Sequence, residues 1–193
     1  MTAIPAFEIG VWNAWILQAV FLLAAMLPDL FMGQEAKLSM KRMSQSIPLN
    51  KRNKILANST HVIIMPFVFV YSIFLPLKLG TVWFYIGLPI FLLSVVMYII
   101  TVINIANTSA DQPVTRGIYR FMRHPIYLSG FLMYLGIGIA SASWVVILCG
   151  VLWILFFIIV VPAEEAFLNA KYGDIYRNYM VRTPRWIEIP KST

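Results

Sequence analysis

The sequence predicts an all-α fold: a polytopic bundle of five transmembrane helices followed by a C-terminal cytoplasmic helical segment. Composition and patterning both lead to this prediction. The 193-residue chain is 60% hydrophobic and 12% charged, with a mean hydropathy of +0.79, whereas soluble domains are about 45–50% apolar. The apolar residues also gather into long runs, and a helix needs roughly 20 of them to cross the hydrocarbon core. The length suits one domain, residues 1–193.

Five apolar runs are the predicted spans. They cover about 9–27, 59–79, 82–106, 126–140 and 144–161. Only residues 141–143, all of them small, separate the last two runs, and so short a break predicts the tip of a helical hairpin. Pro66, Pro76 and Pro89 fall inside the second and third spans, where membrane helices tolerate proline if neighbours satisfy the freed backbone groups. No cleavable signal pattern precedes the first run, so we expect it to be retained.

The basic residues predict the orientation. They group between spans one and two (Lys37, Lys41, Arg42, Lys51, Arg52, Lys54), between spans three and four (Arg116, Arg120, Arg123) and after span five (Lys171, Arg177, Arg182, Arg185, Lys191). Only Lys78 falls on the other side, so the positive-inside rule predicts an external N-terminus and a cytoplasmic C-terminus. The net charge of +7 is then a topology signal, and no nucleic-acid partner is predicted.

The placement of the polar residues and of the single cysteine argues against a transport pathway and against a metal site. Asp, Glu, Lys and Arg are absent from the interior of the predicted spans, where transporters and proton pumps usually carry such residues. The single cysteine, Cys149, has no neighbouring His/Cys cluster with ligand spacing, so no metal site is predicted. The polar residues instead collect at the predicted cytoplasmic boundary, where we expect the site to lie.

The first polar segment at this boundary reads "TRGIYRFMRHPIY", residues 115–127. Gly117 permits a backbone turn that other residues resist. Pro125 suits the first turn of a helix and pushes His124 out of the helical region. On its own, the segment is better explained as an interface anchor in which Arg120 and Arg123 reach lipid phosphates.

The second segment reads "VVPAEEAFLNAKYGDIYRNYM", residues 160–180. Neighbours on a helix face about 100° apart, so Glu164 and Glu165 do not form one paired-carboxylate unit; one can face the bundle while the other meets solvent or an arginine. The alternative is an acidic first turn of a helix that starts at Pro162. Beyond the pair, a stripe predicts a helix on the cytoplasmic ends of the spans, with a break at 173–174. Its members are Leu168, Tyr172, Ile175, Tyr176 and Tyr179.

The hairpin brings the two segments to the same side of the membrane. Together they offer arginines, a histidine, aromatic rings and carboxylates to a ligand that carries a carboxylate and hydroxyl or cationic groups. S-adenosylmethionine has this combination of groups.

The order of motifs, "RGIY…RHPIY", an apolar hairpin, then "EEAFLNAKYGDIYRNYM…TPRWI", resembles the integral-membrane isoprenylcysteine carboxyl methyltransferase family, in its small five-span prokaryotic form. The resemblance covers about 116–190. It implies a cofactor region, 109–193, and S-adenosyl-L-methionine bound by Arg116, Gly117, Ile118, Tyr119, His124, Glu164 and Leu168. Eukaryotic members carry a substrate-carboxylate arginine where this chain has Val160; Arg120 or Arg123 could replace it in binding substrate.

The resemblance implies methyl transfer to the C-terminal carboxylate of a prenylated cysteine or a similar lipophilic carboxylate, with S-adenosyl-L-homocysteine as product. Such a carboxylate is already ionised at neutral pH, so no general base is required. The lipophilic substrate would enter from the bilayer. One alternative is a phospholipid N-methyltransferase, whose amine substrate needs a base such as His124 or Glu165. An NADPH-dependent sterol-type reductase and a non-enzymatic membrane scaffold are the remaining alternatives.

Overall fold

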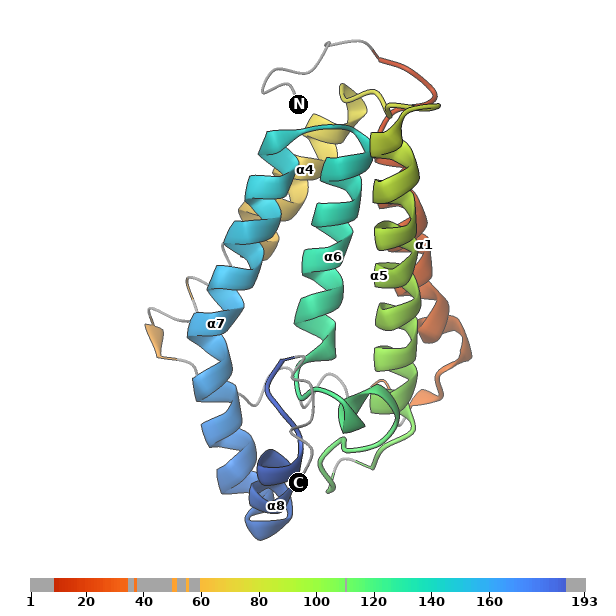
Figure 1. Cartoon of the computed structure of the whole chain (residues 1–193). Helices are drawn as coiled ribbons and strands as arrows, with labels where there is room; N and C mark the ends of the chain where they lie inside the picture. The colour runs from red at the N-terminus through yellow and green to blue at the C-terminus, as the bar shows by residue number, and fades with distance from the viewer. Residues whose placement is uncertain are drawn as a thin grey trace.

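The computed structural model describes residues 9–34, 37, 50, 51, 55, 60–109 and 111–186 (Figure 1). Within these ranges the regular elements are helices, and one isolated antiparallel bridge pairs Asn13 with Pro76. The elements are α1 (Trp15–Phe31), a π-helical turn η1 (Thr60–Ile64), α4 (Met65–Ile73), α5 (Val82–Ala106), a 3-10 turn η2 (Gly117–Arg120), α6 (Pro125–Ala140), α7 (Trp144–Tyr172) and α8 (Asp174–Arg182). The predicted all-α class is therefore confirmed for the described part of the chain.

Two of these helices, α5 and α7, are long and apolar enough to cross a membrane. Only 33% of the most apolar stretch of α5 and 39% of that of α7 is buried inside the structure, unlike the core helix of a soluble protein. Large apolar side chains such as Leu93 on α5 and Ile159 on α7 are more than half exposed. Exposed apolar surface on this scale marks lipid contact, so the chain is a membrane protein. Three shorter apolar helices accompany α5 and α7, and the count of five spans stays a prediction.

The predicted second span, 59–79, is too long. Helix α4 ends at Ile73, and residue 59 lies outside the described residues. Pro76, placed inside this span by the sequence, instead follows the helix in the bridge to Asn13. Proline has no N–H to donate and drives the preceding residue out of the helical region. The extended segment pairs with the chain before α1, because Ala14 N donates to Leu75 O at 2.8 Å.

The predicted hairpin is confirmed, since α6 ends at Ala140 and α7 begins at Trp144. Helices α5 and α6 pack closely along their length through small residues (Figure 1). A Cβ on Gly87 would lie 2.3 Å from Ala140 N, and one on Gly136 would lie 2.5 Å from Phe91 N. Small residues of this kind let membrane helices approach until their backbones touch. The tight α5–α6–α7 packing fixes the ends of α6 and α7 relative to each other.

Helix α7 continues through Pro162 as far as Tyr172. The alternative of a new helix starting at Pro162 is therefore wrong. A proline inside a membrane helix frees one carbonyl without ending the helix when neighbours satisfy it. Glu164 and Glu165 consequently lie in the last third of a continuous 29-residue helix. They do not lie in a first turn, where the helix dipole would favour acidic residues.

The break predicted at 173–174 is also confirmed. Gly173 has φ +58° and donates its N–H to Asn169 O at 2.9 Å, which ends α7, and α8 begins at Asp174. The predicted stripe is partly correct. Tyr172, Tyr176 and Tyr179 form a buried cluster with Leu168 packed against it, but Ile175 is 63% exposed.

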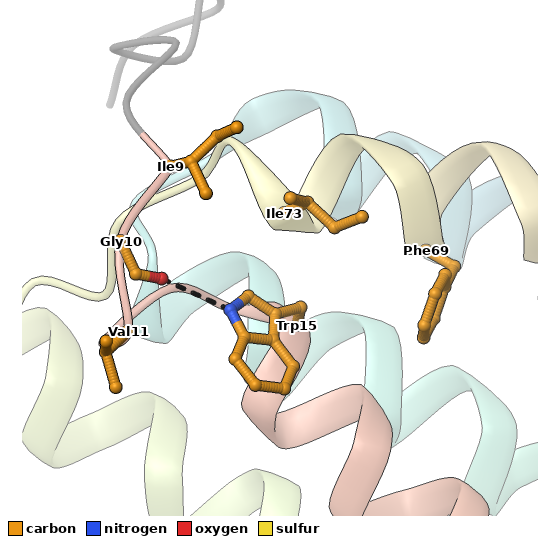
Figure 2. A pocket seen from close by; sticks show the side chains of 6 residues that line it. All are labelled: Ile9, Gly10, Val11, Trp15, Phe69 and Ile73. Carbon is orange, nitrogen blue, oxygen red and sulfur yellow. Dashed lines mark hydrogen bonds between the residues drawn. The ribbon is translucent and has the colours of Figure 1, made fainter.

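Two apolar cavities lie along α1 and α4. One of about 390 Å³ is lined by residues before and in α1, such as Gly10 and Trp15, and by Phe69 and Ile73 of α4. Figure 2 shows the Trp15 indole N–H directed at Gly10 O, a hydrogen bond of 3.2 Å. A second cavity of about 280 Å³ shares Phe69 and reaches Gln18 and Tyr134. None of the residues predicted from the sequence to bind cofactor or substrate lines either cavity.

Candidate functional site

The polar cluster forms where three parts of the chain meet, at the end of the hairpin opposite its tip. These are the start of α6 with Arg123 and His124, the last turns of α7 with Glu164 and Glu165, and the residues just after α8. The sequence dictates this meeting because Pro125 begins α6 while α7 runs on past the hairpin partner. In Figure 1, α8 lies beside the same end of α7.

Glu165 is the centre of the cluster. Its side chain is 8% exposed and its carboxylate meets three partners. His124 Nε2 lies 3.1 Å from Oε1 in a hydrogen bond, and Arg123 Nε forms an ion pair with the same oxygen at 3.0 Å without hydrogen-bond geometry. Arg185 donates from Nε to Oε1 at 3.1 Å and from Nη2 to Oε2, a bidentate pair. Such pairs are among the strongest polar contacts in proteins.

These partners determine the ionisation of Glu165, which lies beyond the apolar stretch 144–161. Burial by itself raises the pKa of the carboxyl group. Hydrogen bonds from His124 and Arg185 and the charge of Arg123 outweigh burial and lower the pKa from 4.5 to about 2. Glu165 is therefore a carboxylate at neutral pH. Because all of its partners are donors, it is poorly suited to accept a proton during a reaction.

His124 contacts two aromatic rings and is 4% exposed. Its ring stacks on Tyr127 with centroids 5.8 Å apart and is tilted against Trp186 with centroids 5.9 Å apart. A carboxylate can only accept, so His124 Nε2 carries the proton in the contact with Glu165. The other ring nitrogen, Nδ1, lies 3.9 Å from Glu164 Oε2. His124 thus lies between the two adjacent carboxylates and is hydrogen-bonded to Glu165.

Glu164 has a different environment. The Tyr127 hydroxyl donates to Glu164 Oε2 at 2.7 Å, and the Glu164 side chain is 19% exposed. Tyr127 is itself fixed by stacking on Phe157, with centroids 3.9 Å apart, and by the hydrogen bond from Trp153 Nε1 to its carbonyl at 3.1 Å. Within the described structure no hydrogen bond to Glu164 Oε1 is formed. This oxygen is left to accept from a ligand.

The turn at η2 lies against the end of α5. Gly117 has φ +60°, and a Cβ there would lie 1.9 Å from Asn104 Oδ1, so no other residue fits without displacing Asn104. Tyr119 follows, and its carbonyl accepts the Tyr179 hydroxyl at 2.7 Å. Burial, with the charge of Glu164 second, raises the pKa of Tyr119. The Tyr119 hydroxyl is therefore protonated at neutral pH. It can take part in hydrogen bonds near Glu164 but does not act as a base.

The structure brings some predicted residues together and leaves others apart. His124 and Glu164 lie side by side, with Tyr119 close enough for its pKa to depend on Glu164. Leu168 packs against the tyrosine cluster. Arg116 and Arg120 are exposed, and Ile118 is partly buried.

Arg123, predicted as a substrate residue, is committed to the protein. Its Nη1 donates to Met180 O at 2.8 Å and to Thr183 O at 3.1 Å, and its backbone N–H donates to Pro184 O at 3.0 Å. It ties the start of α6 to the segment after α8. Val160, which stands where eukaryotic members carry the substrate-carboxylate arginine, lies in α7 and is 4% exposed.

Sequence reasoning missed the roles of Tyr127 and Arg185, and gave Glu165 no structural role. The available signal for Glu165 was the 100° separation of adjacent helix positions, which already placed one carboxylate of the pair towards the bundle. For Arg185 the signal was an arginine and a tryptophan directly after an amphipathic helix. Within the described residues no group of three or more His, Cys, Asp or Glu side chains is placed to hold a metal ion.

Comparison with known proteins adds an independent finding. Residues 105–175 match the family model described as phospholipid methyltransferase. The chain is also 36% identical over 78 residues to the protein-S-isoprenylcysteine O-methyltransferase of Schizosaccharomyces pombe. That match covers 39% of this chain and 33% of the yeast protein, so the chain spans about a third of the length of this curated relative. The resemblance drawn from the motifs is confirmed over this part of the chain, and it supports a methyltransferase at the level of the family.

Proposed function

We propose that this membrane protein, whose residues 105–175 match a methyltransferase family, transfers a methyl group from S-adenosyl-L-methionine to the carboxylate of a prenylated cysteine or a similar lipophilic acid. The observation that carries the proposal is the pair of Glu164 and Tyr127 beside His124, within the matched segment. It is a polar, partly open site between the ends of two apolar helices.

The residues present fit the cofactor. Glu164 Oε1 can accept from the ribose hydroxyls or the amino group of the cofactor, as a charge-assisted hydrogen bond. Gly117 allows the η2 turn to pack against Asn104 of α5, and Ile118, Tyr119 and Leu168 supply apolar and aromatic surface. When bound, S-adenosyl-L-methionine supplies an electrophilic methyl group and leaves as S-adenosyl-L-homocysteine.

The chemistry of the cluster favours a carboxylate acceptor. A terminal carboxylate has a pKa of about 3.3–3.7 and needs no base, whereas an amine at neutral pH must first lose a proton. Glu165 is engaged by hydrogen bonds with His124 and Arg185 and by an ion pair with Arg123, and His124 Nε2 carries a proton, so only His124 Nδ1 is left to serve an amine as a base. The protein's part is then to align the acceptor and exclude water, and alignment can contribute up to roughly 7–11 kcal/mol.

A phospholipid N-methyltransferase is the second candidate, because the matched family model carries that description. In this case His124 Nδ1, 3.9 Å from Glu164, is the nitrogen placed to take the proton of the amine. The two candidates differ only in the acceptor, so the product distinguishes them.

We further propose that the site faces the cytoplasm and that the lipid tail of the substrate enters between helices from the bilayer. The distribution of basic residues supports this orientation. A membrane site suits such a reaction because the tail is soluble in lipid while the cofactor is soluble in water.

The test uses the full chain in detergent with S-adenosylmethionine labelled in its methyl group. Acceptors are an S-farnesylated cysteine analogue and, in a parallel reaction, phosphatidylethanolamine. The proposal predicts label in a base-labile ester of the cysteine analogue. Label in the phospholipid headgroup supports the second candidate, and no transfer to either acceptor contradicts both.

A further inference from the structure

The ion cluster of Arg123, Glu165 and Arg185 is not neutral. It holds two guanidinium groups, which stay protonated at neutral pH, and one carboxylate. Glu164 does not compensate directly, since its carboxylate accepts from Tyr127 and no ion pair within the described residues joins it to an arginine. These three groups therefore carry one positive charge in excess, and Arg185, the most exposed of them, is the group that an anion can approach.

Arg185 offers the open side of this cluster. Its Nε and Nη2 donate to Glu165, which leaves the two N–H groups of Nη1 without a hydrogen bond in the described structure. The side chain is 41% exposed, compared with 8% for Glu165. The two bonds to Glu165 fix the plane of the guanidinium group, so Nη1 is presented to a ligand at little further cost in entropy.

The other arginines near the site are less suited to this role. Arg123 is 11% exposed, and its Nη1 is already engaged by the carbonyls of Met180 and Thr183. Arg116 and Arg120 are exposed, and no ion pair within the described residues fixes the geometry of either. Arg185 combines partial exposure with a fixed orientation, and Trp186 beside it packs against His124.

We infer that Arg185 binds the carboxylate of a bound ligand through Nη1 and so determines the class of molecule that the site accepts. This rests on the proposed function, which offers two sources of a carboxylate: the amino-acid part of the cofactor and the terminus of the acceptor. Arg185 lies beyond the segment matched by the family model, 105–175. Its role is thus a property read from the geometry of this chain.

The test compares ligands that differ only in the carboxylate. Calorimetry measures the affinity of the full chain in detergent for S-adenosylhomocysteine and for methylthioadenosine, which lacks the amino-acid part. Kinetics measure KM for a farnesylated cysteine acid and inhibition by its methyl ester. Each is done with the wild type, Arg185→Leu, Arg185→Lys and the matched control Arg182→Leu, an exposed arginine at the end of α8.

The expected result is a loss of about tenfold or more for one carboxylate ligand in Arg185→Leu, with its carboxylate-free partner unchanged. Loss confined to S-adenosylhomocysteine assigns the cofactor carboxylate, and a raised KM confined to the cysteine acid assigns the acceptor carboxylate. Arg185→Lys keeps the charge but not the planar fork, so we expect a smaller loss in the same ligand. If Arg185→Leu fails to fold, the affinities of Arg185→Lys for the same ligands test the inference instead.

Two results overturn the inference and leave the proposed function standing. One is a wild type that binds cofactor and turns over while Arg185→Leu and Arg185→Lys change nothing. The other is an equal loss for ligands with and without the carboxylate, which is what a purely structural role predicts. A wild type that binds neither nucleoside and methylates nothing removes the proposed function, and the inference with it.

Discussion

His124 Nε2 lies 3.1 Å from Oε1 of Glu165, and this contact joins the start of α6 to the end of α7. The two residues are 41 positions apart, and the hairpin is what makes them neighbours. The same carboxylate is bound by Arg185, after α8, so a single buried charge holds three parts of the chain together. The cluster therefore holds these three parts of the chain together and lies beside the proposed site.

Replacing Glu165 with glutamine should destabilise the fold. The change leaves two arginines without their counter-charge, and breaking a buried ion pair costs about 3–5 kcal/mol. We expect the lower end of this range, because Arg185 is 41% exposed. Thermal unfolding in detergent measures the effect. Asp174→Asn is the control, since its pair with Arg177 is exposed and should matter little; an equal loss in both variants would contradict the central role of Glu165.

The lowered pKa of Glu165 predicts an acid-dependent loss of stability. The unfolded carboxyl group binds a proton near pH 4.5 and the folded one only near pH 2. Between these values the unfolded state binds more protons, so this contribution to stability is full above about pH 5 and falls as the pH drops towards 2. Unfolding temperatures measured across that window should converge for wild type and Glu165→Gln at the acid end. A difference in unfolding temperature between the two proteins that stays constant across this pH range would contradict the lowered pKa of Glu165.

Tyr127→Phe should weaken cofactor binding while leaving the fold intact. The ring still stacks on Phe157, but the hydroxyl that positions Glu164 is lost. The lost hydrogen bond lies within the protein, so the change acts on Kd by releasing Glu164 from its position, and we expect a loss of affinity of about tenfold. Calorimetry with S-adenosylhomocysteine measures this, and Tyr85→Phe, 66% exposed on α5, is the control. Equal affinities in Tyr127→Phe and wild type would show that the Tyr127–Glu164 hydrogen bond does not contribute to cofactor binding.

Gly117→Ala should strain the turn at η2. A left-handed conformation in a residue other than glycine costs about 1–3 kcal/mol, and here the new Cβ also meets Asn104. We expect weaker cofactor binding, partly restored when Asn104→Ala removes the clash. Without any restoration in the double variant, the backbone conformation alone would be responsible.

Much of the architecture follows from local backbone preferences that can be recognised in the sequence. Pro125 starts α6 and the small residues at 141–143 end it, since both act through backbone chemistry that does not depend on partners. Pro76 and Pro162 show the limit of the same rules. The first falls outside a helix that the apolar pattern extends, because the segment pairs with the chain before α1. The second lies inside α7, because the surrounding apolar helix tolerates it.

The composition of the site was predictable only in part. Motif order pointed to His124 and Glu164, and these two do lie together. The ion cluster depends on tertiary contacts between residues 20 to 60 positions apart, such as Arg185 with Glu165 and Arg123 with Thr183. No local pattern encodes which arginine reaches which acceptor. Arg123 was consequently expected to meet substrate, whereas the structure commits it to Glu165 and to backbone carbonyls.

The most direct test of the account is calorimetric titration of S-adenosylhomocysteine into wild type and Glu164→Ala. The account predicts saturable one-site binding to the wild type and at least about tenfold weaker binding to the variant, with a smaller fall in unfolding temperature than Glu165→Gln shows. Within the described structure Glu164 accepts one hydrogen bond, from Tyr127, so its loss should leave the protein folded. Absence of binding by the wild type, or equal affinity in Glu164→Ala, would contradict the claim that this site binds the cofactor.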